Sequence, residues 1–199
     1  MGVVAQNVPV ATLTEMRQLK QSSGRAWQRA VVGQTPFRSW LQERGSLTAR
    51  LKKHYPAFSV ELLAQAWRKP HVDEQAMLRL HAMSRAWVRE VMLRGNGQPR
   101  VFAHSVIARQ DLRGPWCRLR AIGRVPLGAA LFANPKVTRG PLQFRKLYAQ
   151  HPLHQAVCRY HPQLQQHPLW ARRSLFRLHH HLLLVTEVFL PACVDHPHD

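Results

Sequence analysis

AWVREVMLRGNGQPRVFAHSVIA, residues 86–108, predicts a β-hairpin. Two alternating runs flank the tetrapeptide GNGQ at 95–98, and an Asn-Gly pair is the strongest short-range signal for a hairpin turn. Because successive side chains of a strand point to opposite faces, every second residue shares a face. On the first strand, one face carries Trp87, Arg89, Val91 and Leu93. The stretch therefore predicts an antiparallel sheet.

A second pair of strands is predicted near the end of the chain. Residues 172–178 and 182–190 read as strands on either side of His179-His180-His181, which we expect to form a solvated turn. On the last strand, Glu187 falls on the face that also carries Leu183, Val185 and Phe189. The region between the two pairs, which contains residues 126–132, is predicted to be helix and loop.

Helices are predicted before the first hairpin. Thr35-Pro36 is a helix start signal, and Ser46 is placed to cap a second helix. Residues 59–67 are predicted to form a third helix, and a Thr12–Glu15 capping box indicates a short one within a weakly ordered arm at 1–35. Helices followed by an antiparallel sheet with a helical insertion predict an α+β fold.

Composition narrows the class of protein. The chain has 199 residues, of which 45% are hydrophobic, so we expect one domain, 1–199, with a real core. Its three cysteines fit a reducing compartment, and no apolar run approaches the ~20 residues that a membrane span needs. The first residues lack the pattern of a signal peptide. We expect a cytoplasmic protein without a transmembrane segment.

The net charge of +19 raises nucleic-acid binding as one interpretation. However, the 29 basic residues are spread along the whole chain, and the longest basic runs are pairs such as Arg172-Arg173. The sequence contains no zinc-finger, RNP or phosphate-loop pattern. We therefore expect no specific nucleic-acid partner, and keep a basic nucleic-acid-binding protein as a lesser alternative.

Two charged residues on apolar strand faces are the strongest candidates for chemistry. Burying a carboxylate such as Glu187 on an apolar strand face costs free energy unless the group is paired or protonated. A position at the edge of the sheet, or a structural Arg partner, would also account for a Glu on this face. Arg89 offers a planar fork that matches a carboxylate, although it could instead pair with Glu187 or extend to solvent. The residues alone leave these alternatives open.

Other types of site find less support. The His- and Pro-rich stretch at 140–168 contains four histidines and Cys158, but its spacing fits an irregular loop and no metal-ligand pattern closes. The Gly-x-Ser-x-Gly motif of serine hydrolases does not occur, and no activating base is evident for the cysteines. We expect no metal.

Several segments, in order, resemble the chorismate pyruvate-lyase family of bacterial ubiquinone biosynthesis. They cover most of residues 37–192. The matching stretches are Trp40-Leu41, Gly45-Ser46-Leu47-Thr48, Trp87-Val88-Arg89-Glu90-Val91, Val125-Pro126-Leu127-Gly128, Leu131-Phe132, Trp170-Ala171-Arg172-Arg173-Ser174 and residues 182–191, which end in Thr-Glu-Val-Phe-Leu-Pro.

The resemblance implies a six-stranded antiparallel sheet with an enclosed ligand pocket beneath helical flaps. It also implies conversion of chorismate to 4-hydroxybenzoate and pyruvate without a metal or organic cofactor. We expect the protein to be a monomer. The family's substrate-contacting Arg and Glu fall on Arg89 and Glu187, and its two pocket-covering apolar residues fall on Leu47 and Leu127. Arg172 is a candidate for a second carboxylate or for pairing with Glu187.

The sequence also departs from the family. Arg100 follows Pro99 where Trp is frequent, and His104 stands where Arg is usual. A non-catalytic sensor is the main alternative, because the same fold resembles the effector domains of some bacterial transcription regulators. Those proteins carry an N-terminal winged helix-turn-helix, for which residues 1–86 are too short and too poorly patterned.

Overall fold

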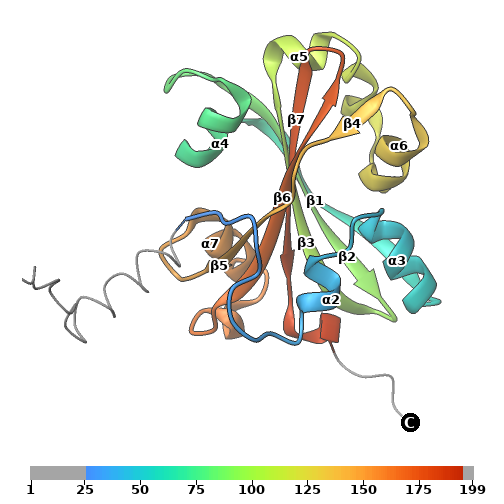
Figure 1. Cartoon of the computed structure of the whole chain (residues 1–199), viewed down its shortest axis with the longest axis vertical. Helices are drawn as coiled ribbons and strands as arrows, with labels where there is room; N and C mark the ends of the chain where they lie inside the picture. Colours follow the sequence, from blue (N-terminus) through green and yellow to red (C-terminus); the bar gives the residue numbers. More distant parts are fainter. Residues whose placement is uncertain (1–25, 195–199) are drawn as a thin grey trace, which may run out of the picture.

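A computed structural model describes residues 26–194, which form an antiparallel sheet with helices on both faces (Figure 1). The order of the strands is β1-β2-β3-β7-β6-β4, and β5 also pairs with β6. The strands are β1 (Phe58–Arg68), β2 (Ala86–Gly95), β3 (Gln98–Ala108), β4 (Val137–Arg139), β5 (Gln143–Leu147), β6 (Leu169–Leu178) and β7 (His181–Phe189). Since β4 and β5 follow one another along the same edge of β6, the seven strands make a sheet six strands wide.

The described helices are short, and the longest has eight residues. They are α2 (Arg38–Leu41), α3 (Leu47–His54), α4 (Val72–Leu78), α5 (Arg109–Arg113), α6 (Leu127–Ala133) and α7 (Pro152–Cys158), with 3₁₀ turns η1 (Cys117–Ala121), η2 (Pro162–Leu164) and η3 (Pro191–Val194). Within the described residues, no helix is long and apolar enough to span a membrane. The α+β class predicted from the sequence is confirmed.

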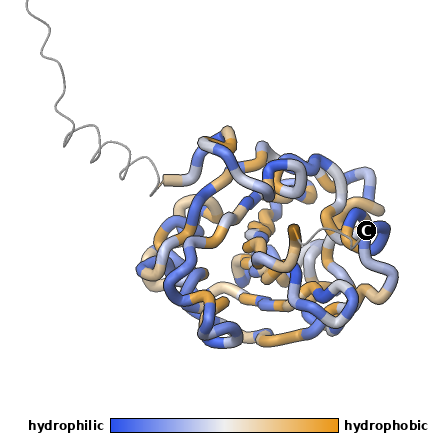
Figure 2. The backbone as a smooth tube through the Cα atoms, turned by 90° about the horizontal axis from the view of Figure 1, so that it is seen from below, coloured by the Kyte–Doolittle hydropathy of each residue, from blue (hydrophilic) through white to orange (hydrophobic). Residues whose placement is uncertain are grey.

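Two helical layers cover the two faces of the sheet (Figure 1). One face packs against α2, α3, α5, η1 and α6, and the other against α4 and α7. On the first face, Leu47 of α3 and Val91 of β2 share a core cluster. On the second, Leu153 of α7 packs with Met92 of β2. In Figure 2 the hydrophobic stretches gather in the central strands between these layers.

The hairpin predicted at 86–108 is confirmed. Its turn has positive φ angles at Asn96 (52°) and Gly97 (76°), which Asn and Gly adopt with little strain. Gly95 pairs with Gln98 at the tip, and the ladder then runs to Ala86 opposite Ala108. The second predicted pair is also observed, as β6 and β7.

The prediction of a helix at 59–67 is wrong, because this segment is strand β1. It pairs with β2 from Phe58 to Arg68, and the register shifts between Leu62 and Ala64. A bulge of this kind interrupts the alternation of apolar and polar residues by which a strand is recognised. Leu, Ala and Gln are strong helix formers, but their preference amounts to only a few tenths of a kcal/mol per residue, so the hydrogen bonds and packing gained by pairing with β2 outweigh it.

The prediction of an irregular loop at 140–168 is wrong in part, because the segment contains β5, α7 and η2. Pro152 stands in the first turn of α7, where its missing N–H is not needed. The His151 ring caps this helix by accepting a hydrogen bond from the Leu153 N–H at 3.2 Å. His154 is 1% exposed, and its ring bonds the His167 carbonyl at 2.8 Å. These histidines therefore support the local fold.

Of the other predicted turns and caps, one is confirmed and one is wrong in part. Ser46 caps α3 as predicted, since its hydroxyl accepts from the Ala49 N–H at 3.3 Å. His179 and His180 are exposed, as the prediction of a solvated turn requires. His181 is half-buried, and its Nδ1 lies 3.0 Å from the Asp111 carboxylate, so the prediction is wrong for this residue. The Thr12–Glu15 capping box lies outside the described residues. Of the predicted arm, residues 26–35 are described, and Trp27 donates to Asp73 at 2.6 Å.

A buried charge cluster links α4 to the second face of the sheet. His104 is 2% exposed, and its two ring nitrogens lie 3.1 Å from Glu74 and 3.2 Å from Glu90. The two carboxylates raise the pKa of His104 to about 9, against the opposing effect of burial. Arg68 also pairs with Glu90, at 3.0 Å. His104 thus lies at the centre of this cluster, between two carboxylates.

This cluster predicts that stability falls in mildly alkaline solution. The raised pKa of His104 stabilises the folded state fully below the unfolded value of 6.5, and the gain is lost as the pH rises through about 9. The neighbours Glu74 and Glu90 have lowered pKa values, and that of His71 is also lowered, so they titrate at lower pH. We expect the free energy of unfolding to fall by about 3 kcal/mol between pH 6.5 and 9.5.

Chemical denaturation across this range measures the effect, and His104→Arg is the matched variant. Arg keeps its charge at every pH tested, so its stability should be flat over the window in which the wild type loses stability. Equal slopes for the two proteins would show that His104 does not carry the charge.

Candidate active site

A cavity on the first face lies between the sheet and helices α3 and α6. About 540 Å³ there is not filled by atoms, a volume that includes space open to solvent. The walls come from five strands (β2, β3, β4, β6 and β7), and the cover comes from α3 and α6. The five residues singled out from the sequence all line it: Leu47, Arg89, Leu127, Arg172 and Glu187.

Two helix starts form the cover. Leu47 is the first residue of α3 and is 2% exposed, and Leu127 is the first residue of α6 and is 8% exposed. The two helices touch at Gly128, where an added Cβ would lie 3.0 Å from the Thr48 hydroxyl oxygen. Glycine thus allows α6 to close against α3, and the two leucines exclude water from the cavity.

Arg89 extends from β2 into this cavity and is 4% exposed. One end of its guanidinium is fixed, because Nη2 donates to the carbonyls of Gly123 at 2.8 Å and Val125 at 3.1 Å. Its Nε–H is buried and has no hydrogen-bond partner within the described part of the chain. Burial lowers the pKa of Arg89 to about 10, so the group is charged at neutral pH. Arg89 therefore neither pairs with Glu187 nor extends to solvent, the two alternatives that the sequence left open.

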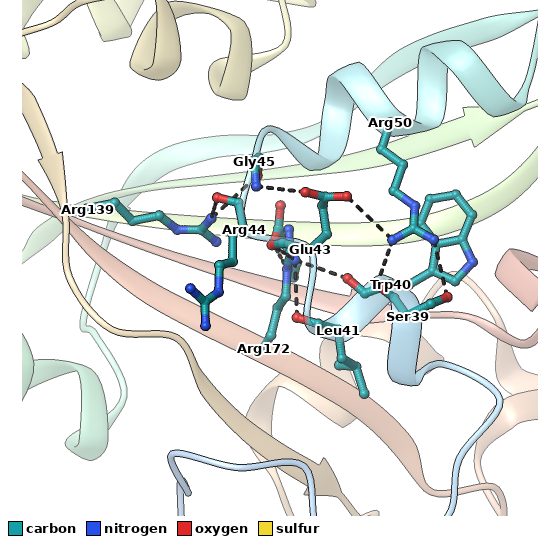
Figure 3. Close-up of polar contacts among 10 residues, drawn as sticks. Ser39, Trp40, Leu41, Glu43, Arg44, Gly45, Arg50, Arg139 and Arg172 are labelled. Carbon is teal, nitrogen blue, oxygen red and sulfur yellow. Dashed lines mark hydrogen bonds and ion pairs between the residues drawn. The ribbon is translucent and has the colours of Figure 1, made fainter.

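Glu187 pairs with Arg172, directly opposite on the neighbouring strand. The Arg172 Nε donates to Glu187 Oε2 at 2.5 Å, and Arg172 is 1% exposed. Its Nη1 donates to three carbonyls of the turn before α3, those of Trp40 (3.0 Å), Leu41 (3.2 Å) and Glu43 (2.7 Å), as Figure 3 shows. Of the two predicted roles for Arg172, the structure shows pairing with Glu187.

Arg139 on β4 is a fourth charged residue of the cavity, and sequence reasoning missed it. Its Nε donates to the Ser174 hydroxyl at 2.8 Å. Its Nη1 donates to the Arg44 carbonyl at 2.9 Å, as Figure 3 shows. Burial lowers the pKa of Arg139, and nearby Glu187 opposes this effect. With Glu187 ionised as the partner of Arg172, the three arginines give the cavity a formal charge of +2. A dianion would neutralise it.

Metal ligation is also possible in principle outside this cavity. His71, Glu74 and His104 present one ligand atom each within 4.8 Å of one another. Each ring nitrogen of His104, however, lies within ion-pair distance of a carboxylate oxygen, and Nδ1 is hydrogen-bonded to Glu90, which fits a doubly protonated ring. A protonated imidazole has no lone pair for a metal, so we interpret the group as a structural ion cluster.

The chain is similar to known proteins over most of its length. Residues 18–196 match the family model described as chorismate lyase. A probable chorismate pyruvate-lyase of Nitrosomonas europaea is 48% identical over 155 residues, which cover 77% of this chain and 85% of that protein. One from Methylobacillus flagellatus is 42% identical over 171 residues, which cover 86% and 96%.

Solved structures share the fold at low identity. The effector domain of PhnF from Mycobacterium smegmatis superposes with a TM-score of 0.51 at 12% identity, covering 74% of this chain and 90% of that one. A GntR-family transcriptional regulator from Bacillus cereus gives 0.50 at 8% identity, covering 71% and 97%. At these identities the likeness concerns the fold alone.

Proposed function

This chain belongs to the chorismate lyase family, and on that premise we propose that it eliminates pyruvate from chorismate to give 4-hydroxybenzoate, the first step of ubiquinone biosynthesis. One observation of the cavity carries the proposal most directly. The buried Nε–H of Arg89 has no partner among the described residues, and Arg89 lines a cavity of formal charge +2. Chorismate has two carboxylates, so its charge and its acceptor atoms match both features.

Arg89 is assigned to the ring carboxylate. Its guanidinium is held by two backbone carbonyls, so little freedom remains to be lost when the ligand binds. A charge-assisted hydrogen bond to a carboxylate satisfies the unpartnered Nε–H. In a cavity covered by Leu47 and Leu127, exclusion of water strengthens that contact.

Glu187 is assigned to the 4-hydroxyl group of the ring. Its Oε2 is bound to Arg172, which leaves Oε1 to accept a hydrogen bond from the substrate. In the reaction, the bond between ring C3 and the ether oxygen breaks, and the hydrogen on C4 leaves as a proton. The electron pair of that C–H bond completes the aromatic ring, and the released enolpyruvate takes up a proton to become pyruvate. Since aromatisation is downhill, holding a reactive conformer in a dry site is the main task of the protein.

We propose that Arg139 binds the second carboxylate, because Arg172 is already paired with the carboxylate of Glu187, whereas Arg139 forms no ion pair among the described residues. Arg139→Gln should raise the KM for chorismate by about 10- to 100-fold with a smaller change in kcat, as one charge-assisted bond of about 1.5–3 kcal/mol is lost. Steady-state kinetics measure this. Arg177→Gln, on the exposed side of β6, is the control and should retain the wild-type KM; an unchanged KM in Arg139→Gln would remove Arg139 from the site.

The proposed activity is tested by incubating the purified chain with chorismate and measuring both products. We expect 4-hydroxybenzoate and pyruvate in equal amounts, formed well above the spontaneous rate. Binding of 4-hydroxybenzoate without turnover would instead identify a sensor of the same fold, and tight, steeply salt-dependent retention on DNA or RNA would favour the nucleic-acid alternative.

The remaining properties are part of the same proposal. We propose that the chain acts as a cytoplasmic monomer of one domain, 1–199, without a metal or organic cofactor. Light scattering on the eluting protein would reveal a dimer, and activity after dialysis against a chelator would reveal a required metal.

A further inference from the structure

A second cavity lies on the same face of the sheet, beside the first one. On the same measure it contains about 980 Å³ not filled by atoms. Its lining comes from β1, the residue before β2, α5 and η1, and consists of Trp67, Arg85, Arg109, Leu112, Arg113 and Arg120. Four exposed arginines from three separate segments thus line one cavity that is open to solvent, which we call the arginine cavity.

No carboxylate within residues 26–194 is available to these four arginines. The described segment contains seven Asp and Glu residues, and each of them already lies within ion-pair distance of another cation. The pairs are Glu43–Arg50, Glu61–Arg94, Asp73–Arg173, Glu74–His104, Glu90–Arg68, Asp111–His181 and Glu187–Arg172. Converging like charges repel one another, so an anion from outside the described segment would stabilise the arrangement.

The floor of the arginine cavity is apolar and contains one aromatic side chain, that of Trp67. Trp67 packs edge to face against Trp87, with ring centroids 5.3 Å apart, and Leu112 is 2% exposed beside them. The Arg120 guanidinium lies 5.8 Å from the centroid of the Trp87 ring. A cationic rim over an aromatic floor fits an anion with a flat organic body better than a small inorganic ion.

This cavity is distinct from the proposed active site, and the lining residues of the two do not overlap. They are neighbours along β2, where Trp87 and Arg89 point to the same face two residues apart. The segment 120–125 separates them. It is held on one side by Gln65, which donates to the Arg120 carbonyl at 2.6 Å, and on the other by Arg89, which donates to Gly123.

We propose that the arginine cavity binds an organic anion that has several oxyanion groups on a flat ring. Nucleoside phosphates and aromatic polycarboxylates both have this chemistry. The site does not depend on the proposed lyase activity, since none of its six residues lines the first cavity.

The test is calorimetric titration of the full chain at fixed ionic strength with three probes: ATP, benzene-1,3,5-tricarboxylate and inorganic triphosphate. The first two carry a ring with phosphate or carboxylate groups, and the third has charge without a ring. Arg113→Gln should weaken all three by about tenfold or more. Trp67→Leu should weaken the two ringed probes by about tenfold and leave triphosphate within twofold, and Trp67→Phe should restore ring binding.

Controls make each outcome decisive. Arg159→Gln, an exposed substitution near the end of α7 on the other face, should bind every probe like the wild type. Thermal unfolding confirms that each variant is folded. Unchanged binding in both Arg109→Gln and Arg113→Gln would overturn the proposal, and so would equal losses in Arg159→Gln, which would show attraction by net charge alone. Much tighter binding of a single-stranded oligonucleotide, weakened equally by all variants, would also overturn it in favour of a nucleic-acid surface.

Discussion

Arg89→Ala is expected to lower kcat/KM for chorismate by about 1,000-fold. The substrate carboxylate would lose its buried charged partner in a dry cavity, a loss of about 4 kcal/mol. The side chain is 4% exposed and its Nε–H has no other partner in the described structure, so solvent cannot easily replace it. Assays at several chorismate concentrations would measure the loss.

Two further variants define the cause. Arg89→Lys keeps the positive charge but loses the planar fork, and it should recover only part of the activity. Arg94→Ala removes the next arginine on the same strand, which pairs with Glu61 at the rim of the molecule, and it should stay within about twofold of the wild type. If folded Arg89→Ala retained a kcat/KM close to that of the wild type, the assigned site would be wrong even if the protein does convert chorismate.

Arg172→Leu is expected to have the largest effect on stability. It removes a buried ion pair with Glu187 and three hydrogen bonds to carbonyls at the end of α2 and in the turn before α3, so the carboxylate and these carbonyls lose this partner. Breaking a buried pair in this way costs about 3–5 kcal/mol, which lowers the Tm by about 10 °C for a protein of this size. Differential scanning calorimetry measures the shift.

The matched control is Arg94→Leu. It breaks a half-exposed pair with Glu61, and exposed pairs contribute at most about 1 kcal/mol. Similar Tm values for Arg172→Leu and Arg94→Leu would contradict the role of Arg172 in supporting the turn over the cavity. Glu187→Gln keeps a hydrogen-bond acceptor for Arg172, so it should lose activity with a smaller loss of stability.

Local chemistry explains which elements could be predicted from the sequence. The hairpin at 86–108 depends on two neighbouring residues that tolerate positive φ, and this preference is visible in the chain itself. The cap at Ser46 is equally local. Strand β1 could not be recognised, since a bulge interrupts its alternation and its partner is distant in sequence. Helix α7 was not predicted, because histidine is an unusual residue for the roles it has here: His151 caps the helix and His154 is buried.

The site shows the same division. Arg89 and Glu187 attracted attention because a charge on an apolar strand face needs a partner. Their separate partners depend on the register of β6 against β7 and on the path of residues 120–125, which no local pattern encodes. Arg139 sits on a three-residue strand without a recognisable pattern, and only the edge pairing with β6 brings it to the cavity. The arginine cavity likewise arises from tertiary convergence.

The position of the bound product tests the central claim most directly. A crystal structure of the chain with 4-hydroxybenzoate should place its carboxylate within hydrogen-bond distance of Arg89 Nε and its hydroxyl group against Glu187, beneath Leu47 and Leu127. Product bound with its carboxylate away from Arg89, or bound in the arginine cavity with the first cavity empty, would contradict the account.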